Sequence, residues 1–112
     1  MAVTLSLPLP PPINRMYRFG KGNWYKTKEV RDWEQEAGWM CVGILKTISR
    51  KCRIDIHLYL KRDRDIDGSL KILLDLLESM QIIKNDSLVY KLDVEKEFDK
   101  DNPHVEITIK EL

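Results

Sequence analysis

Hydrophobic and polar residues alternate along four stretches of the chain, which is the pattern of half-buried β-strands. The four stretches are residues 3–9, 54–60, 88–94 and 105–109. The second is the clearest, and its polar face carries His57, which we expect at the surface rather than on a metal. The turn sequence FDKDNPH separates the last two stretches, so they are expected to form an antiparallel hairpin.

Two other stretches place apolar residues at helical spacing. The first predicts a helix over residues 28–47, capped by Thr27, with a buried stripe that includes Cys41 and Met40. The second predicts a helix over residues 66–80. The order β-α-β-α-β-β, without repeats, indicates an α/β (α+β) fold in which two helices cover one mixed sheet. Prolines exclude a helix from residues 8–23, where we expect a loop with a mobile turn.

The length of 112 residues and the hydrophobic content of 43% fit one folded domain spanning residues 1–112. No apolar run is long enough for a transmembrane helix, and the N-terminus lacks the basic region of a signal peptide. The two cysteines, Cys41 and Cys52, are not at metal-ligand spacing. These features predict a cytoplasmic protein with reduced thiols.

The charge is unevenly distributed although the net charge is only +1. Residues 1–31 carry a net charge of +5 and residues 50–64 of +4, whereas residues 86–112 carry −4. In the loop that follows the first strand, Arg18 and Lys21 alternate with Tyr17 and Phe19. Cations among aromatic rings suit phosphates and exposed bases, so a polyanionic partner is indicated. A plain solvated loop is the alternative interpretation.

The segment RDRDIDGSLK, residues 62–71, crowds carboxylates where the second strand ends and the second helix begins. An extended chain would place Asp65 and Asp67 on one face, whereas a helix starting at Asp67 would make that residue the N-cap, with Lys71 one turn later. Either geometry offers paired oxygen ligands for a hard divalent cation. The best third acid is Asp86, which a neighbouring strand could bring to the pair, and Asp75 is next.

Each part of this pattern also has an ordinary structural interpretation. Asp67 could be only a helix cap, and Lys71 with Asp75 could be a surface ion pair. Asp86 could belong to a plain turn, and Asp63 is expected to face solvent without a role. Taken alone, the short pattern of two aspartates and a lysine would recur by chance.

The combination of four segments is more specific than any one of them. PLPPPINRMYR, RDRDIDGSLKILLDLL, IIKNDSLV and a terminal VEITI occur in this order, and the chain resembles the RusA family of Holliday junction resolvases. The resemblance implies a homodimeric endodeoxyribonuclease that nicks four-way DNA junctions symmetrically during recombination and repair. It also implies Mg²⁺ as the cofactor, with Mn²⁺ as an alternative ion. The family is common in phages and prophages.

The same resemblance implies roles for individual residues. Asp65, Asp67 and Asp86 match the essential acidic residues and would be the metal ligands, and Lys71 matches the essential lysine. The DNA contacts implied by the resemblance, together with Arg18 of the aromatic loop, are Asn14, Arg15, Arg18, Lys61, Arg62 and Arg64.

The chain departs from the family pattern at three positions. Gly68 replaces a frequent asparagine, Asn85 replaces a frequent aspartate, and Asp63 interrupts the basic run. These changes bear on sequence preference and metal affinity rather than on the class of reaction.

Two other functions remain open from the sequence. One is a non-catalytic DNA-binding protein of phage replication or recombination, with a vestigial acidic cluster. The other is a small metal-dependent phosphohydrolase acting on nucleotides, but the chain has no glycine-rich phosphate loop. The retained set of Asp65, Asp67, Lys71 and Asp86 favours the nuclease, because a decayed site has no reason to keep all four.

Overall fold

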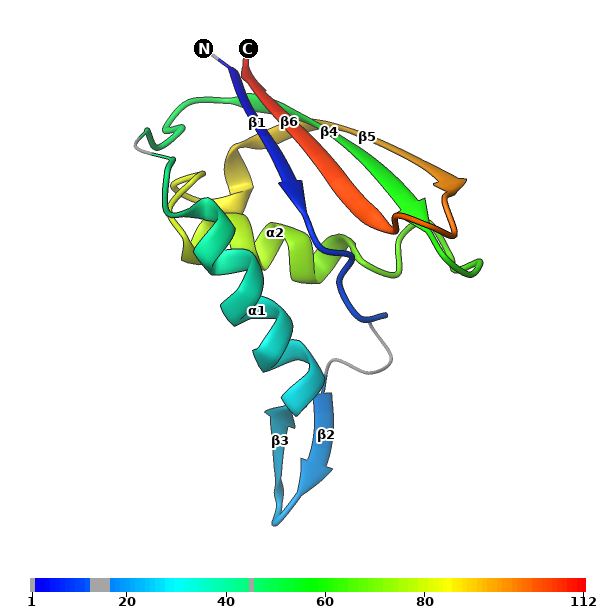
Figure 1. The fold of residues 1–112 in the computed structure, drawn as a ribbon. Helices are drawn as coiled ribbons and strands as arrows, with labels where there is room; N and C mark the ends of the chain where they lie inside the picture. The colour runs from blue at the N-terminus through cyan, green and yellow to red at the C-terminus, as the bar shows by residue number, and fades with distance from the viewer. Residues whose placement is uncertain (1, 13–16, 45) are drawn as a thin grey trace.

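The chain forms a four-stranded sheet, a separate two-stranded hairpin and two α-helices (Figure 1). This computed structural model describes residues 2–12, 17–44 and 46–112. Its elements in chain order are β1 (Ala2–Leu7), β2 (Tyr17–Gly20), β3 (Asn23–Lys26), α1 (Lys28–Cys41), β4 (Cys52–Leu60), α2 (Leu70–Ser79), the 3₁₀ turn η2 (Asp86–Leu88), β5 (Val89–Phe98) and β6 (His104–Glu111).

The main sheet is mixed and has the strand order β1-β6-β4-β5. Strand β6 runs antiparallel to both β1 and β4, whereas β5 runs parallel to β4. Both helices lie on one face of this sheet, and the other face is open (Figure 1). The prediction of a mixed sheet covered by two helices is therefore confirmed.

Strand β4 is the centre of the core. Its residues alternate between buried and half-buried along the whole strand, as the sequence predicted. The buried side chains meet Val105, Ile107 and Ile109 of β6 on one side and Leu73 and Leu77 of α2 within the same core cluster. The alternation arises because one face of β4 packs under the helices and the other faces solvent.

The predicted hairpin between the last two strands is wrong, because β4 lies between them. The connection passes the end of β4, where the Asp99 N–H donates to the Leu60 carbonyl at 2.9 Å. The alternate residues of β6, such as Ile107, are fully buried, which favours a central position. Strand β5 is exposed along most of its length and forms the edge of the sheet.

Both helices are shorter than predicted. Helix α1 ends at Cys41 rather than at residue 47, because the Val42 N–H bonds back three residues to Trp39 and a glycine follows. Met40 lies within the helix but off its buried face, so it is half exposed instead of belonging to the core. The cap at Thr27 is confirmed, since its Oγ1 accepts from Val30 N at 3.4 Å.

The hairpin formed by β2 and β3 was not predicted, since that region was expected to be a loop. Its turn residues Lys21 and Gly22 have φ angles of 51° and 79°, which is the geometry of a two-residue type I′ hairpin turn. Figure 1 shows the hairpin projecting from the N-terminal end of α1, away from the main sheet.

Both cysteines are free and buried, and burial raises the pKa of each thiol. Cys41 therefore behaves as a small apolar core residue, as expected, and Cys52 does so too. Among the residues that the structure describes, no helix is long and apolar enough to cross a membrane.

Candidate active site

The aspartate loop, residues 61–69, joins the end of β4 to the start of α2. Asp65 and Asp67 are both exposed on this loop. Their backbone carbonyls accept bonds from Gly68 N at 3.0 Å and from Leu70 N at 3.2 Å, so the segment forms a tight turn before the helix. A Cβ on Gly68 would lie 3.2 Å from the Asp65 carbonyl oxygen, so glycine allows this turn to close.

Helix α2 begins at Leu70, later than predicted, and Ser69 rather than Asp67 is its N-cap. The Asp67 carboxylate therefore does not cap the helix, and the interpretation of Asp67 as the N-cap is wrong. Ser69 is fully buried and makes no side-chain cap bond; its Oγ instead accepts from Arg64 Nη1 at 3.0 Å. This leaves both carboxylates of the loop facing solvent.

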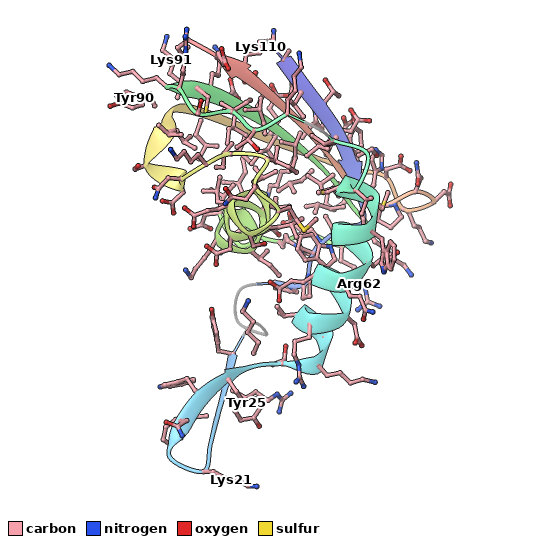
Figure 2. The ribbon with its side chains drawn as sticks, turned by 90° about the vertical axis from the view of Figure 1, so that its left-hand side faces the viewer. Lys21, Tyr25, Arg62, Tyr90, Lys91 and Lys110 are labelled. Carbon is pink, nitrogen blue, oxygen red and sulfur yellow. The ribbon has the colours of Figure 1, made fainter. Side chains whose placement is uncertain are left out.

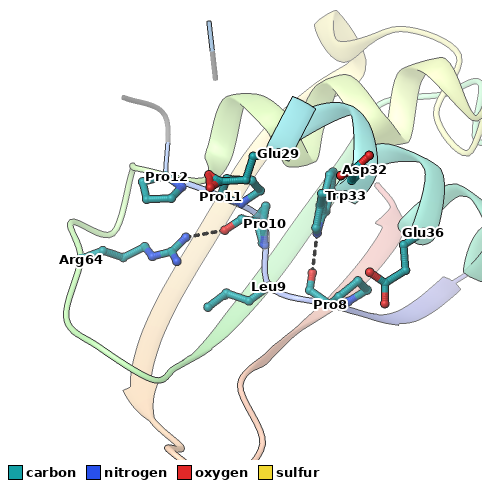
Figure 3. Close-up of a pocket in the computed structure, with 10 residues that line it drawn as sticks. All are labelled: Pro8, Leu9, Pro10, Pro11, Pro12, Glu29, Asp32, Trp33, Glu36 and Arg64. Atoms are coloured by element: carbon teal, nitrogen blue, oxygen red, sulfur yellow. Dashed lines mark hydrogen bonds between the residues drawn. The ribbon is translucent and has the colours of Figure 1, made fainter. Parts of the chain in front are cut away.

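Arg64 ties the aspartate loop to the proline segment, residues 8–12. Its Nη1 donates to the Pro10 carbonyl at 2.6 Å (Figure 3). The same nitrogen donates to Ser69 Oγ. The proline segment is itself fixed to α1, because Trp33 Nε1 donates to the Pro8 carbonyl at 2.8 Å. Arg64 is therefore half-buried and engaged in structural bonds, whereas its role in DNA binding stays a prediction.

Asp63, expected to face solvent without a role, has a partner. Lys96 Nζ of β5 lies 2.9 Å from Asp63 Oδ1 and donates to the Arg64 carbonyl at 2.8 Å. The hydrogen bond and charge of Lys96 lower the pKa of the Asp63 carboxyl. Asp63 is indeed exposed, but it anchors the beginning of the aspartate loop to the edge strand.

Lys71 lies in the first turn of α2, next to the aspartate loop. Its Nζ is 3.5 Å from Asp75 Oδ2, one helical turn further on, and both side chains are substantially exposed. The surface-pair interpretation is therefore correct as geometry. It does not exclude a catalytic role for Lys71, because an exposed pair of this kind is weak and exchanges partners easily.

Asp86 lies at the other end of α2 from the aspartate loop (Figure 1). Its N–H donates to Glu78 Oε1 at 3.0 Å, which places it beside the last turn of the helix. Because α2 has ten residues, its ends are about 15 Å apart. The expectation that a neighbouring strand brings Asp86 to Asp65 and Asp67 is wrong within one chain. Because β4 and β5 are parallel, the end of β4 and the start of β5 lie at opposite ends of the strand pair.

Asn85 supports the turn that carries Asp86. Its Oδ1 accepts from Ser87 N at 2.8 Å, so this residue caps η2. The amide that replaces a frequent family aspartate thus has a structural use here. Within the described ranges no group of three or more histidine, cysteine or acidic side chains could hold a metal ion.

The candidate DNA contacts fall into separate regions. Lys61 and Arg62 are exposed on the aspartate loop, and Arg18 is exposed on the β2–β3 hairpin. Asn14 and Arg15 lie outside the described residues. Figure 2 shows Lys21 at the tip of the hairpin, far from Lys91 at the end of the main sheet.

The hairpin also presents aromatic rings to solvent. The centroids of Phe19 and Trp24 are 5.3 Å apart, and both rings are largely exposed. The aromatic residues on both sides of Lys21 and Gly22 are the feature of the sequence from which this hairpin could have been predicted. Exposed rings beside cations form a surface on which unpaired bases can stack.

The residues that hold the aspartate loop could not be predicted from the sequence. Lys96 and Pro10 contact the loop across 32 and 54 positions of the chain, respectively. Such contacts depend on the strand order, which local patterns do not reveal.

Comparison with known proteins identifies the family. The family model "Endodeoxyribonuclease RusA" matches residues 8–110. The curated protein "Crossover junction endodeoxyribonuclease RusA" of Aquifex aeolicus (strain VF5) is 36% identical over 104 residues, which cover 89% of this chain and 82% of the relative. The matched range includes the proline segment, the aspartate loop and the turn that carries Asp86. The chain therefore belongs to the RusA family of endodeoxyribonucleases.

Proposed function

We propose that this endodeoxyribonuclease resolves four-way DNA junctions as a homodimer, with Mg²⁺ as its cofactor and Mn²⁺ as a substitute. The observation that carries the proposal is the pair of exposed carboxylates, Asp65 and Asp67, held next to Lys71 in a chain of the RusA family. The relative from Aquifex aeolicus bears the name of a crossover junction endodeoxyribonuclease.

The donor set suits a hard divalent cation. Mg²⁺ usually binds one or two carboxylates together with phosphate oxygens of the substrate and water. Asp65 and Asp67 supply two carboxylates on one exposed turn, which leaves space for a DNA phosphate. When bound, such a cation supplies Lewis-acid stabilisation of the attacked phosphate and activates water. The third predicted ligand, Asp86, has to come from elsewhere, because it lies at the far end of α2.

Lys71 is proposed to act at the reacting phosphate. Its ammonium projects from the first turn of α2, adjacent to the aspartate loop, and is more than half exposed. An ammonium at this position can stabilise the charge that develops on the phosphate oxygens. The pair with Asp75 is weak, so a DNA phosphate can displace Asp75 as the partner of Lys71.

A second copy of the chain can supply Asp86. Asp86 lies just before the start of the edge strand β5. Near the end of the same strand, Lys96 bonds to the aspartate loop. A two-fold contact in which the β5 strands run antiparallel would bring the start of one β5 to the end of the other. Asp86 of one copy would then approach Asp65 and Asp67 of its partner.

The side chains of β5 favour such a contact. Leu92 and Phe98 align with the buried residues Ile54 and Leu60 of β4, on the helix-covered face. They are nevertheless 42% and 67% exposed, because neither helix covers the edge strand. An exposed apolar stripe on an unpaired edge strand is typical of a protein–protein interface. A dimer also suits a four-way junction, which has two equivalent scissile positions.

DNA is proposed to contact the basic residues of the aspartate loop and the aromatic hairpin. Lys61 and Arg62 flank the carboxylates and would bind phosphates near the scissile position. Arg18 and the neighbouring rings of the hairpin would bind the junction at a second place, and Asn14, Arg15 and Arg64 complete the predicted contacts.

A junction cleavage assay tests this proposal. A labelled four-way junction with Mg²⁺ should give paired nicks, and a linear duplex of the same sequence should not. Asp67→Asn should abolish the nicks and retain junction binding, because it removes a ligand from an exposed turn. A folded, dimeric protein that binds the junction without nicking it would instead support the non-catalytic DNA-binding alternative.

A further inference from the structure

We infer that Lys96 is a positioning residue of the nuclease site, which holds the aspartate loop in place through Asp63 and the Arg64 carbonyl. This inference rests on the proposed function, in which Asp65 and Asp67 bind the metal ion. It gives a role to Asp63, which interrupts the basic run of the family.

The contacts converge on the backbone just before the two carboxylates. Lys96 Nζ lies 2.9 Å from Asp63 Oδ1 and 2.8 Å from the Arg64 carbonyl oxygen. One ammonium therefore fixes a side chain and a peptide group of consecutive residues. Asp65 follows directly in the sequence, so the position of its backbone depends on this bond.

The loop is held from a second side by Arg64 itself. Its guanidinium donates to the Pro10 carbonyl of the proline segment and to Ser69 Oγ, so Arg64 at one end of the turn is bonded to Ser69 at the other. Between these anchors, Asp65 and Asp67 are exposed, and their side chains make no hydrogen bond or ion pair within the part of the chain that the structure describes. The anchors thus fix the ends of a short segment whose middle is available to ligands.

The contacts of Lys96 are expected to position the aspartate loop and to contribute little to the stability of the fold. Lys96 and Asp63 are both exposed to solvent, and exposed ion pairs contribute little to the free energy of unfolding. A bond to a backbone carbonyl restricts the loop even when its net contribution to stability is small. Removing Lys96 should therefore loosen the aspartate loop while the rest of the fold stays intact.

Strand β5 gives the contact a second consequence. Lys96 lies near the end of the edge strand β5, and Asp86 lies just before the start of the same strand. In the proposed dimer, Lys96 would couple the aspartate loop to the strand that forms the interface. Metal binding and pairing of the two copies would then depend on the same anchor.

The test compares Lys96→Met with Lys91→Met, a matched change on the same strand. Lys91 is exposed and lies far from the aspartate loop, on the other face of β5. Lys96→Met should raise the Mg²⁺ concentration for half-maximal cleavage on the order of tenfold, whereas Lys91→Met should leave it unchanged. Junction affinity without metal should be the same for both variants. Lys96→Arg, which keeps a cation and donors, should restore the wild-type metal requirement.

A second readout does not depend on cleavage. The Gly68 and Leu70 amides bond to the Asp65 and Asp67 carbonyls, so their hydrogen exchange reports the order of the turn. Exchange at these amides should accelerate in Lys96→Met and not in Lys91→Met. Unchanged exchange would overturn the inference even if the protein cleaves junctions as proposed. If wild-type protein does not cleave but exchange accelerates, the proposed function fails and the anchoring role stands.

Cleavage data can also overturn the inference. If Lys96→Met weakens junction binding as much as it weakens cleavage, Lys96 is a phosphate contact and not a positioning residue. If its metal requirement equals that of Lys91→Met, the anchor does not act on the metal site.

Discussion

Asp67 and Asp86 lie at opposite ends of α2, separated by the length of a ten-residue helix. The resemblance to the RusA family predicts a metal-binding role for both, yet one chain does not bring them together. The parallel arrangement of β4 and β5 imposes this separation, because the loop that follows β4 and the turn that precedes β5 lie at opposite ends of the strand pair. A shared site between two copies would reconcile the sequence pattern with the fold.

Arg64 and Arg62 should differ in what they contribute. Arg64→Ala removes donors from the Pro10 carbonyl and from the buried hydroxyl of Ser69, and should lower the free energy of unfolding by about 1–3 kcal/mol. Arg62 is exposed, so Arg62→Ala should leave stability within about 0.5 kcal/mol of the wild type. Denaturant unfolding measures both values.

Junction binding should depend on Arg62 even though the free energy of unfolding does not. If Arg62 contacts one phosphate, Arg62→Ala should reduce the slope of log affinity against log salt by about 1. An unchanged slope and affinity would remove Arg62 from the DNA interface. Equal loss of stability in both arginine variants would contradict the anchoring role of Arg64.

The hairpin rings should contribute to junction affinity and not to stability. Trp24 is 70% exposed, so Trp24→Ala should leave the melting temperature unchanged and weaken junction binding by about 1–3 kcal/mol if a base stacks on it. Trp39→Ala on α1 is the matched control, because that ring is 72% exposed and lies away from the hairpin. Equal affinities of the two variants in a binding titration would exclude the hairpin from DNA contact.

His104 should give the fold a dependence on pH near neutrality. The pKa of its ring is raised, first by the bond to the Asn102 carbonyl and then by Glu106. A raised pKa in the folded state stabilises the fold fully below about pH 6.5, the unfolded value, and this contribution disappears as the pH rises through the folded value. His104→Gln should therefore lose more stability at pH 5.5 than at pH 8.

Melting temperatures of both proteins across this pH range provide the measurement. A constant difference between wild type and His104→Gln over the whole range would contradict the assigned role.

The fold could be predicted from the sequence where its cause is local. The alternation along β4 and the cap at Thr27 follow from residue patterns within a few positions, and both are confirmed. The insertion of β6 between β1 and β4 could not be predicted, because strand order depends on contacts that are distant in the sequence. Met40 was assigned to the core wrongly because the buried face of α1 follows Val30, Trp33, Ala37 and Cys41, and Met40 lies off that face.

The candidate site likewise contains residues that could be predicted from the sequence and residues that could not. Asp65, Asp67 and Lys71 are close in the sequence, and the fold keeps them on one loop and the adjoining helical turn. Asp86 was placed with them by analogy between neighbouring strands, and the helix between the two segments separates them instead. Lys96 and the proline segment could not be recognised, because nothing near them in the sequence marks a contact with the aspartate loop.

A complementation experiment tests most directly whether two copies share one site. Asp67→Asn and Asp86→Asn should each be inactive alone. In a mixed dimer, the Asp86→Asn chain would contribute its intact Asp65 and Asp67, and the Asp67→Asn chain its intact Asp86, which restores one complete site. Mixing the two variants should therefore recover nicking of one strand per junction. If mixed dimers form and no nicking returns, the shared site proposed here is contradicted.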